Sequence, residues 1–214
     1  MPFRGFASFA SYTRARYRTL IVSAFSMAFA AFAINNTRAS AQGVDVSTTT
    51  RLEKTAASIR ARDRKAKANL NALIAAEPDG QERTKLAALL WQLPAQDATV
   101  SDYDAALADA DARVRLTAVV GLGKRAGAAA AARLEKLLAS DPVSGVREAA
   151  AFWLGQPGRE SSAPALGAAL TQDKDPQVRV QAAQALSRLG TTQALGLLHR
   201  GAKDSDERVK KWAR

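Results

Sequence analysis

The sequence predicts an all-α protein, a right-handed α-solenoid built from helical hairpins. The main observation is a motif repeated at a nearly fixed spacing of 32, 32 and 31 residues: Val114-Arg115, Val146-Arg147, Val178-Arg179 and Val209-Lys210. Each copy has an alanine four residues after its valine, and the first three have a leucine eight residues after it. Such a period is typical of solenoids, in which stacked helical units share one continuous core.

The composition agrees with this fold class. Hydrophobic residues make up 47% of the chain and aromatic residues 6%, and much of the hydrophobic share is alanine, the residue with the best helix propensity. The chain has no cysteine, which excludes disulfides and cysteine-based metal sites.

Residues 1–41 have the pattern of a secretory signal peptide. The first 44 residues contain arginines but neither Asp nor Glu, and residues 20–34 carry no charge. The tripeptide Ala39-Ser40-Ala41 that follows is typical of a cleavage site. We therefore expect cleavage after Ala41 and a periplasmic or secreted mature protein.

Two alternatives stay open for this segment. If uncleaved, it would anchor the protein in a membrane, although its apolar stretch is shorter than the roughly 20 residues that span a bilayer. An Arg-rich segment without acids also suits an organellar transit peptide. Removing residues 1–41 takes away five arginines and no acid, so the formal net charge falls from +11 to +6. This mild excess disfavours nucleic acid as a partner.

Residues 42–66 are predicted to form a polar lead-in and a basic N-terminal helix. Five cations and one acid lie between Arg60 and Lys67. Such a run is an alternative contact for an anionic membrane or a nucleic acid. A solvated helix is the simpler interpretation, because no aromatic residue interrupts the run to stack on bases.

Residues 67–214 are predicted to form four to five helical hairpins. The first repeat, 67–94, is degenerate, with Glu82-Arg83 at the motif position, as expected where a terminal repeat meets water. The later hairpins pair a first helix with a second helix that the motif opens, and the last one is cut short: 103–108 with 114–124, 128–139 with 146–154, 163–171 with 178–189, and 193–202 with 207–214.

Helix-capping residues occupy the turns within the hairpins. Asp175 precedes Pro176, which suits an N-cap followed by a proline at the first helical position. Asp111 and Asp206 stand at the same offset from their valines. We expect all three aspartates to cap or to stack the second helices.

The second of the clear repeats departs from this pattern. Asp141-Pro142 lies two residues earlier than its counterpart, and Val143 occupies the cap position, which predicts a longer turn there. Glycines are expected to end the second helices, as they commonly do at helix C-termini: Gly127, Gly158 and Gly190.

The strings DARVRLTAVVGLG, SGVREAAAFWLG, DPQVRVQAAQALSRLG and DERVKKWAR resemble the HEAT-repeat family, in particular the short bacterial type known as phycobilisome-lyase-like HEAT repeats. The resemblance implies the fold over about residues 67–214. It carries little about activity, because the repeated motif is structural. It also implies that the motif arginines commonly serve to stack repeats.

A basic residue follows the motif valine in each repeat: Arg115, Arg147, Arg179 and Lys210. One interpretation is a stripe that holds an acidic partner. The favoured interpretation is structural, with each arginine paired to a cap aspartate of a neighbouring repeat, such as Asp111, Asp175 or Asp206, because Arg suits bidentate carboxylate pairing.

The remaining chemistry-bearing residues predict no catalytic, cofactor or metal site. His199 is the only histidine, so a His-based metal site is excluded, as is the iron-dependent hydroxylase branch of HEAT proteins, which the resemblance associates with His-Glu pairs. Trp91, Trp153 and Trp212 are out of register with one another and are expected to pack in the core. Trp153 with its neighbour Phe152 is nevertheless a candidate anchor for a partner peptide.

These observations favour an exported, non-enzymatic scaffold that presents a concave helical surface to a protein partner. A bilin-lyase-like enzyme or chaperone subunit is the first alternative, which the resemblance implies. A HEAT-like nucleic-acid binder is the second. The identity of the partner and the oligomeric state are left open.

Overall fold

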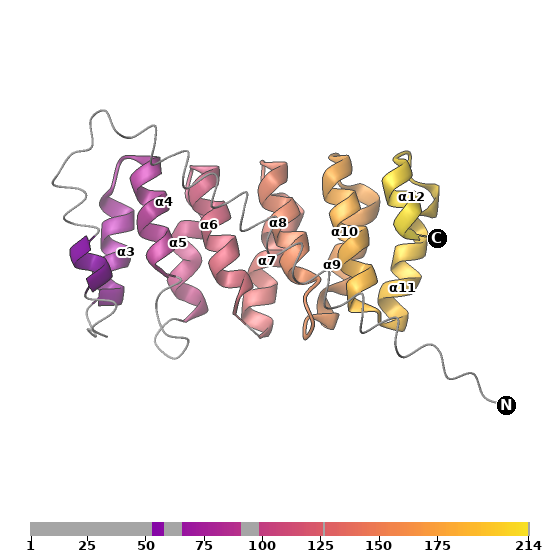
Figure 1. The fold of residues 1–214 in the computed structure, drawn as a ribbon, viewed down its shortest axis with the longest axis horizontal. Coiled ribbons are helices and arrows are strands. Elements are labelled where there is room, and N and C mark those ends of the chain that lie inside the picture. Colours follow the sequence, from indigo (N-terminus) through magenta and orange to yellow (C-terminus); the bar gives the residue numbers. More distant parts are fainter. Residues whose placement is uncertain (1–52, 58–65, 91–98, 126, 214) are drawn as a thin grey trace. The chain divides into compact units, whose positions relative to one another are not determined.

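A computed structural model describes residues 53–57, 66–90, 99–125 and 127–213, and every regular element in these ranges is helical (Figure 1). The predicted signal peptide, the lead-in and the basic run from Arg60 lie almost wholly outside the described residues. Within them, no helix combines the length and apolar character that a membrane span requires. From residue 66 onward the elements are α3 (Ala66–Ala76), α4 (Gly80–Leu89), η2 (Val100–Tyr103), α5 (Asp104–Leu107), α6 (Ala112–Gly123), α7 (Ala128–Ser140), α8 (Ser144–Leu154), η3 (Glu160–Ser162), α9 (Ala163–Gln172), α10 (Pro176–Leu189), α11 (Thr192–Leu198), η4 (His199–Lys203) and α12 (Glu207–Ala213).

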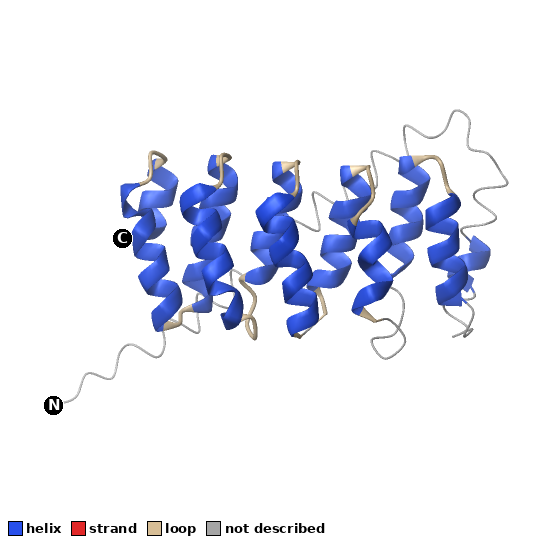
Figure 2. Cartoon of the chain, turned by 180° about the vertical axis from the view of Figure 1, so that it is seen from behind, coloured by secondary structure: helices blue, strands red, loops and turns tan. Residues whose placement is uncertain are grey.

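The helices form successive antiparallel pairs, as the repeat predicts. In each hairpin the second helix packs against the second helix of the next hairpin, so that α4, α6, α8, α10 and α12 make one row. The first helices α7, α9 and α11 likewise contact their neighbours. Seen from behind in Figure 2, the described residues consist of helices joined by loops, with no strand among them. We call α4, α6, α8, α10 and α12 the second-helix row.

The repeated motif builds the core of this array. The motif valines are at most 1% exposed, and the alanines and leucines that follow them are buried as well: Val114, Val146, Val178, Val209, Ala118, Ala150, Ala182, Ala213, Leu122, Leu154 and Leu186. Full burial of one such leucine or valine contributes about 1.5–3 kcal/mol. The small alanines let neighbouring helices approach closely, and so the period in the sequence corresponds to one shared core.

Aspartates cap the second helices at their N-termini. Asp111 accepts a hydrogen bond from the Arg113 backbone N–H, and Asp175 accepts one from Gln177. Asp206 accepts from the backbone N–H of Arg208 in the same way. The aspartates therefore satisfy helix N–H groups that have no partner within the helix.

Two predictions about the turns are wrong. The turn before α8 (141–143) has the same length as the turn before α10 (173–175), so the absence of a cap aspartate does not lengthen it. Of the three glycines, only Gly190 ends a second helix, in the left-handed conformation with φ 63°. Gly127 (φ 105°) instead precedes α7, and Gly158 (φ 86°) lies in the loop before η3. Helix α6 ends at Gly123, one residue before its predicted end, and α8 ends at Leu154, as predicted. Gly123 and the C-cap residue Gly155 lie close to Trp153 of α8 and Ala185 of α10.

We predict that Val143→Asp stabilises the protein by about 1 kcal/mol, because Val143 holds the N-cap position of α8 but offers no side-chain acceptor. The side chain is exposed, so little buried apolar contact is lost. The melting temperature should rise by about 2–4 °C in thermal unfolding followed by circular dichroism. Val143→Ala, which supplies no acceptor, should give no such gain. A lower melting temperature for Val143→Asp would contradict the capping argument.

Candidate functional site

The motif arginines join neighbouring repeats through buried ion pairs. Arg115 donates from Nε and Nη2 to the two carboxylate oxygens of Asp141, at 2.8 and 2.9 Å. Its Nη1 donates to the backbone carbonyls of Asp109 and Ala110, at 2.8 and 3.0 Å. One guanidinium thus binds the turn of its own hairpin and the turn of the next one.

The same arrangement recurs along the array. The pairs, each with Nε and Nη2 of the arginine on one carboxylate, are Arg83–Asp109, Arg115–Asp141, Arg147–Asp173 and Arg179–Asp204. The side chains of Arg147 and Asp173 are 5% and 6% exposed. We call these four pairs the clasps. Because each is bidentate and largely shielded from water, it fixes the relative position of two hairpins.

The expected pairing with the cap aspartates is wrong: the partner carboxylate lies two residues before the cap position. Asp175 uses its side chain on the first turn of its own helix. Asp173 faces the preceding hairpin, and its second role is to accept the backbone N–H of Asp175. In the turns that have two aspartates, the two therefore have different tasks. The signal was present in the sequence, since Asp109, Asp141, Asp173 and Asp204 recur at the period of the motif.

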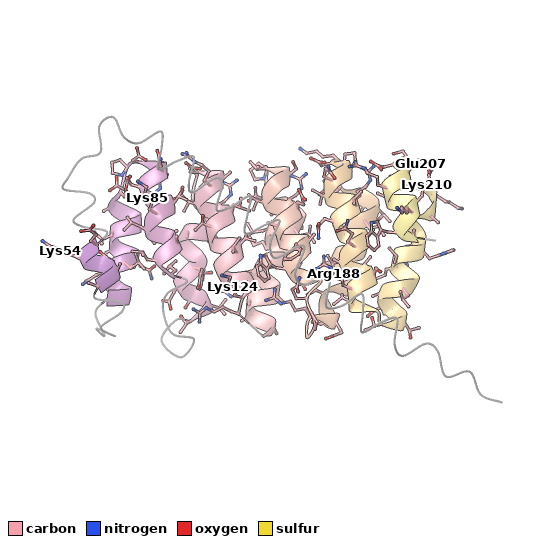
Figure 3. All side chains as sticks on the ribbon, in the orientation of Figure 1. Lys54, Lys85, Lys124, Arg188, Glu207 and Lys210 are labelled. Atoms are coloured by element: carbon pink, nitrogen blue, oxygen red, sulfur yellow. The ribbon has the colours of Figure 1, made fainter. Side chains whose placement is uncertain are left out.

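Lys210 does not form a clasp. Its Nζ donates to Glu207, three residues earlier in the same helix, at 2.6 Å, and the Glu207 side chain is 75% exposed. Figure 3 shows both side chains close together at one end of α12. A lysine lacks the flat fork of donors with which arginine binds a carboxylate and a carbonyl together.

The pKa shifts of the clasp and cap residues favour their charged forms. The hydrogen bond from Arg179 lowers the pKa of the Asp204 carboxyl, and the same bond raises the pKa of Arg179. At the caps, the side-chain hydrogen bond from Arg113 lowers the pKa of Asp111 to about 2. These groups therefore keep their charges at neutral pH, which suits a structural role better than proton transfer.

A second group of side chains joins the C-terminal ends of α6, α8 and α10. We call it the cationic–aromatic cluster: Tyr103, Arg125, Phe152, Trp153, Arg159 and Arg188. The Phe152 and Trp153 rings meet edge to face, with centroids 5.3 Å apart and planes at 82°. The Arg188 guanidinium lies 4.9 Å from the Phe152 ring centroid, and its Nη1 donates to the Phe152 carbonyl at 3.3 Å. A helix of the next repeat thus places a cation on this aromatic pair.

The other half of the cluster lies between Tyr103 and the end of α6. Tyr103 is fully buried, and the Arg125 guanidinium lies 5.6 Å from its ring centroid. Arg159, only 5% exposed, donates from Nη2 to the carbonyls of Gly123 and Arg125 at 3.0 and 2.6 Å. Among the residues that the structure describes, its Nη1 is buried without a hydrogen-bond partner, and burial lowers the pKa of Arg159. The carbonyls at the end of α6 partly balance this buried charge.

Gly123 links the two halves of the cluster. A Cβ atom on this residue would collide with the Trp153 indole, so the glycine lets the ring lie against the backbone of α6. Trp153 and Phe152 are both half-buried. The sequence indicated these two aromatic residues, but Arg125, Arg159 and Arg188 do not follow the 32-residue period, so the repeat did not reveal them.

The remaining candidates lie apart from these two sites. Trp212 is half-buried and packs against the core, and His199 is exposed; Trp91 lies outside the described residues. Within the part of the chain that the structure describes, no group of three or more His, Cys, Asp or Glu side chains is placed to hold a metal ion.

Stacked hairpins with a shared core and clasps between repeats define a helical repeat protein of the α-solenoid class. The chain belongs to the HEAT-repeat family: the family model, described as HEAT repeats, matches residues 66–155 and 144–214. No curated protein sequence matches the chain.

Solved structures show the same fold at low sequence identity. Human deoxyhypusine hydroxylase in complex with glycerol is 22% identical, with a TM-score of 0.50 over 78% of this chain and 66% of that one. The S. pombe condensin Cnd3-Cnd2 subcomplex is 21% identical, with a TM-score of 0.54 over 70% and 22%. The complex of CpcE and CpcF of phycocyanin lyase from Nostoc sp. PCC7120 is 23% identical, with a TM-score of 0.50 over 82% and 72%. The chain spans less than two thirds of the first two, and these likenesses concern the fold alone.

Proposed function

We propose that this protein is an exported, non-enzymatic scaffold that binds a protein partner on the solvent-facing side of its second-helix row. In this proposal the hairpins coil into a right-handed superhelix, with that row on the concave side. The observation that carries it is the series of clasps. Because buried bidentate pairs fix each hairpin to the next, the row is a stiff surface that loses little conformational freedom when a partner binds.

The residues on this surface suit a protein partner. The positions six residues after Glu82, Val114, Val146 and Val178 share one side of the row: Ala88, Val120, Phe152 and Gln184. They are partly exposed and carry no charge, and Phe152 and Trp153 give the surface an aromatic centre. Partly exposed aromatic residues beside arginine are the side chains that most often dominate binding at protein interfaces.

Two of the similar solved structures are assemblies of more than one protein, the condensin Cnd3-Cnd2 subcomplex and the CpcE–CpcF complex. This precedent supports a protein partner for the present chain. Export is supported by the sequence of residues 1–41, with its arginines, its uncharged stretch and Ala39-Ser40-Ala41.

The proposal predicts a partner on one side of the array only. A photo-crosslinking amino acid is placed at Gln184, on the second-helix row, or at Ala132, which is exposed on the first helix α7. The full chain, tagged at its C-terminus, is captured from cell envelopes after irradiation, and its intact mass is measured by mass spectrometry. We expect one protein crosslinked at Gln184 and none at Ala132, and a mass that begins at Gln42.

The other outcomes are equally informative. Equal crosslinking from Ala132 and Gln184 would place the partner elsewhere and reject the second-helix row. An intact mass that begins at Met1, recovered from the cytosolic fraction, would reject export. If bilin added during expression gave a coloured product, the lyase alternative would replace the scaffold.

A further inference from the structure

Arg188 has part of the hydrogen-bonding pattern of a clasp arginine, but it has no carboxylate partner among the described residues. In every clasp, Nη1 binds a backbone carbonyl while the edge formed by Nε and Nη2 binds the two oxygens of an aspartate, as in Arg147 with Asp141 and Asp173. Nη1 of Arg188 also binds a carbonyl, that of Phe152. Its Nε–Nη2 edge has no acceptor among the residues that the structure describes.

We infer that this open edge of Arg188, with Phe152 and Trp153 beside it, binds a carboxylate on an apolar segment of the protein partner. The inference rests on the proposed function and names the chemistry of the partner at that surface. Arginine pairs with carboxylates in a planar, two-bond geometry, and the four clasps show that this chain uses that geometry repeatedly.

The electrostatic surroundings of Arg188 favour an anion. Among the described residues, the guanidinium groups of Arg159 and Arg188 donate to backbone carbonyls, those of Gly123, Arg125 and Phe152, and neither group is bonded to an Asp or Glu side chain. Figure 3 places Arg188 and Lys124 toward the same end of the array, away from Glu207 and Lys210. The opposite end carries the aspartates of the clasps and caps. Within the described residues, an acidic ligand therefore meets at Arg188 a guanidinium that no described carboxylate neutralises.

The pKa of Arg188 agrees with partial removal from water. Partial burial by the surrounding atoms lowers the pKa of Arg188 to about 10, although the residue is still exposed to solvent. The guanidinium remains charged at neutral pH. Because it has already lost part of its hydration against the Phe152 ring, pairing with a carboxylate requires less further desolvation than pairing of a fully hydrated arginine.

The apolar neighbours favour a protein segment over a polyanion. Val120, Phe152 and Gln184 carry no charge, and Glu148, half-buried on α8, adds a carboxyl to the same row. A nucleic acid or an anionic membrane gains affinity from many cations spread along its surface. A segment with one or two acids and several apolar side chains matches this surface better.

The test uses two synthetic 15-residue amphipathic helical peptides that carry a fluorescent label. Both have leucines at helical spacing and uncharged polar residues elsewhere, except that two of the polar positions hold glutamates in one peptide and glutamines in the other. Binding to the full chain is measured by fluorescence anisotropy, and contact is located from the indole NMR signals, since the chain has three tryptophans. We expect the glutamate peptide to bind at least about tenfold more tightly than the glutamine peptide and to shift the Trp153 signal.

Variants then assign the effect to Arg188. Arg188→Gln should weaken binding of the glutamate peptide about tenfold and leave the glutamine peptide unchanged. The matched control is Arg200→Gln, which removes an equal charge from an exposed residue of η4 and should change neither affinity. Arg188→Glu should gain affinity for a third peptide with lysines in place of the glutamates, a reversal that a misfolded variant would not show.

Three results would overturn the inference. They are equal affinity for the glutamate and glutamine peptides, unchanged binding by Arg188→Gln, and displacement of the glutamate peptide by single-stranded DNA or anionic vesicles at lower concentration than by unlabelled peptide. Crosslinking at Gln184 separates the two proposals. If the wild type and Arg188→Gln capture the partner equally, the scaffold proposal is kept and the carboxylate site at Arg188 is rejected. If the glutamate peptide binds but no partner is captured, the carboxylate site is kept and the scaffold proposal is rejected.

Discussion

Replacing Arg147 by alanine is expected to lower the free energy of unfolding by about 3–5 kcal/mol, the loss typical when one partner of a buried ion pair is removed. The substitution deletes both bonds to Asp173 and the bonds from Nη1 to the Asp141 and Pro142 carbonyls. The Asp173 carboxylate would be left buried without its countercharge. Urea unfolding followed by circular dichroism measures the loss.

The position of Arg147 adds an expectation about cooperativity. In a solenoid each repeat touches only its neighbours, so stability depends on the interfaces between repeats. Arg147 couples the hairpin of α7 and α8 to that of α9 and α10. Weakening this interface should separate unfolding of the two ends of the array, and the urea transition should broaden or divide into two steps. Binding of the partner by the folded protein should change less than stability does.

Arg208→Ala is the matched control for Arg147→Ala. Arg208 also pairs with an aspartate at 2.7 Å, but its side chain is 54% exposed and its partner caps the same helix. An exposed pair of this kind contributes little to stability. A loss below about 1 kcal/mol for Arg147→Ala would show that the clasps contribute no more than surface pairs. In the double variant Arg147→Met with Asp173→Leu, part of the stability should return, because no unpaired buried charge remains. The return is incomplete because the Asp175 N–H and the Asp141 carbonyl lose their partners.

The fold could be predicted from the sequence because the same residues fill the same positions every 32 residues. Valine, alanine and leucine of the motif are buried wherever they occur, and the period survives errors at single helix ends. The turn before α8 shows where prediction from the repeat fails. Its unusual cap position suggested a longer turn, yet the turn keeps its length because Asp141 two residues earlier holds the Arg115 clasp and also accepts the Val143 N–H.

The sites were less predictable for two different reasons. The clasp arginines were visible, but choosing between Asp173 and Asp175 as the partner required knowing which carboxylate the helix N-terminus already uses. The cationic–aromatic cluster had no periodic signal. Arg159 and Arg188 each lie 36 residues from their backbone acceptors, Gly123 and Phe152, and only the stacking of α6, α8 and α10 brings them into reach.

Gly155→Ala is expected to destabilise the protein by about 1–3 kcal/mol, although alanine is the better helix former. An added Cβ atom at Gly155 would lie 2.5 Å from the Ala185 Cβ and 2.6 Å from its Cα. The obstacle is the backbone of α10 and not the tip of a flexible side chain, so α8 and α10 would have to separate where the cationic–aromatic cluster joins them.

Gly145→Ala tests the same substitution at the other end of α8, where space is free. Gly145 lies in the first turn of α8, and a Cβ atom there meets nothing within 4 Å. Its φ is not positive, so alanine should stabilise the protein by about 0.4–1 kcal/mol by restricting the unfolded chain. Opposite signs for the two variants in thermal unfolding would show that the close approach of α8 to α10 overrides helix propensity. If Gly155→Ala also stabilised the protein, the two helices could not be packed as closely as the structure has them.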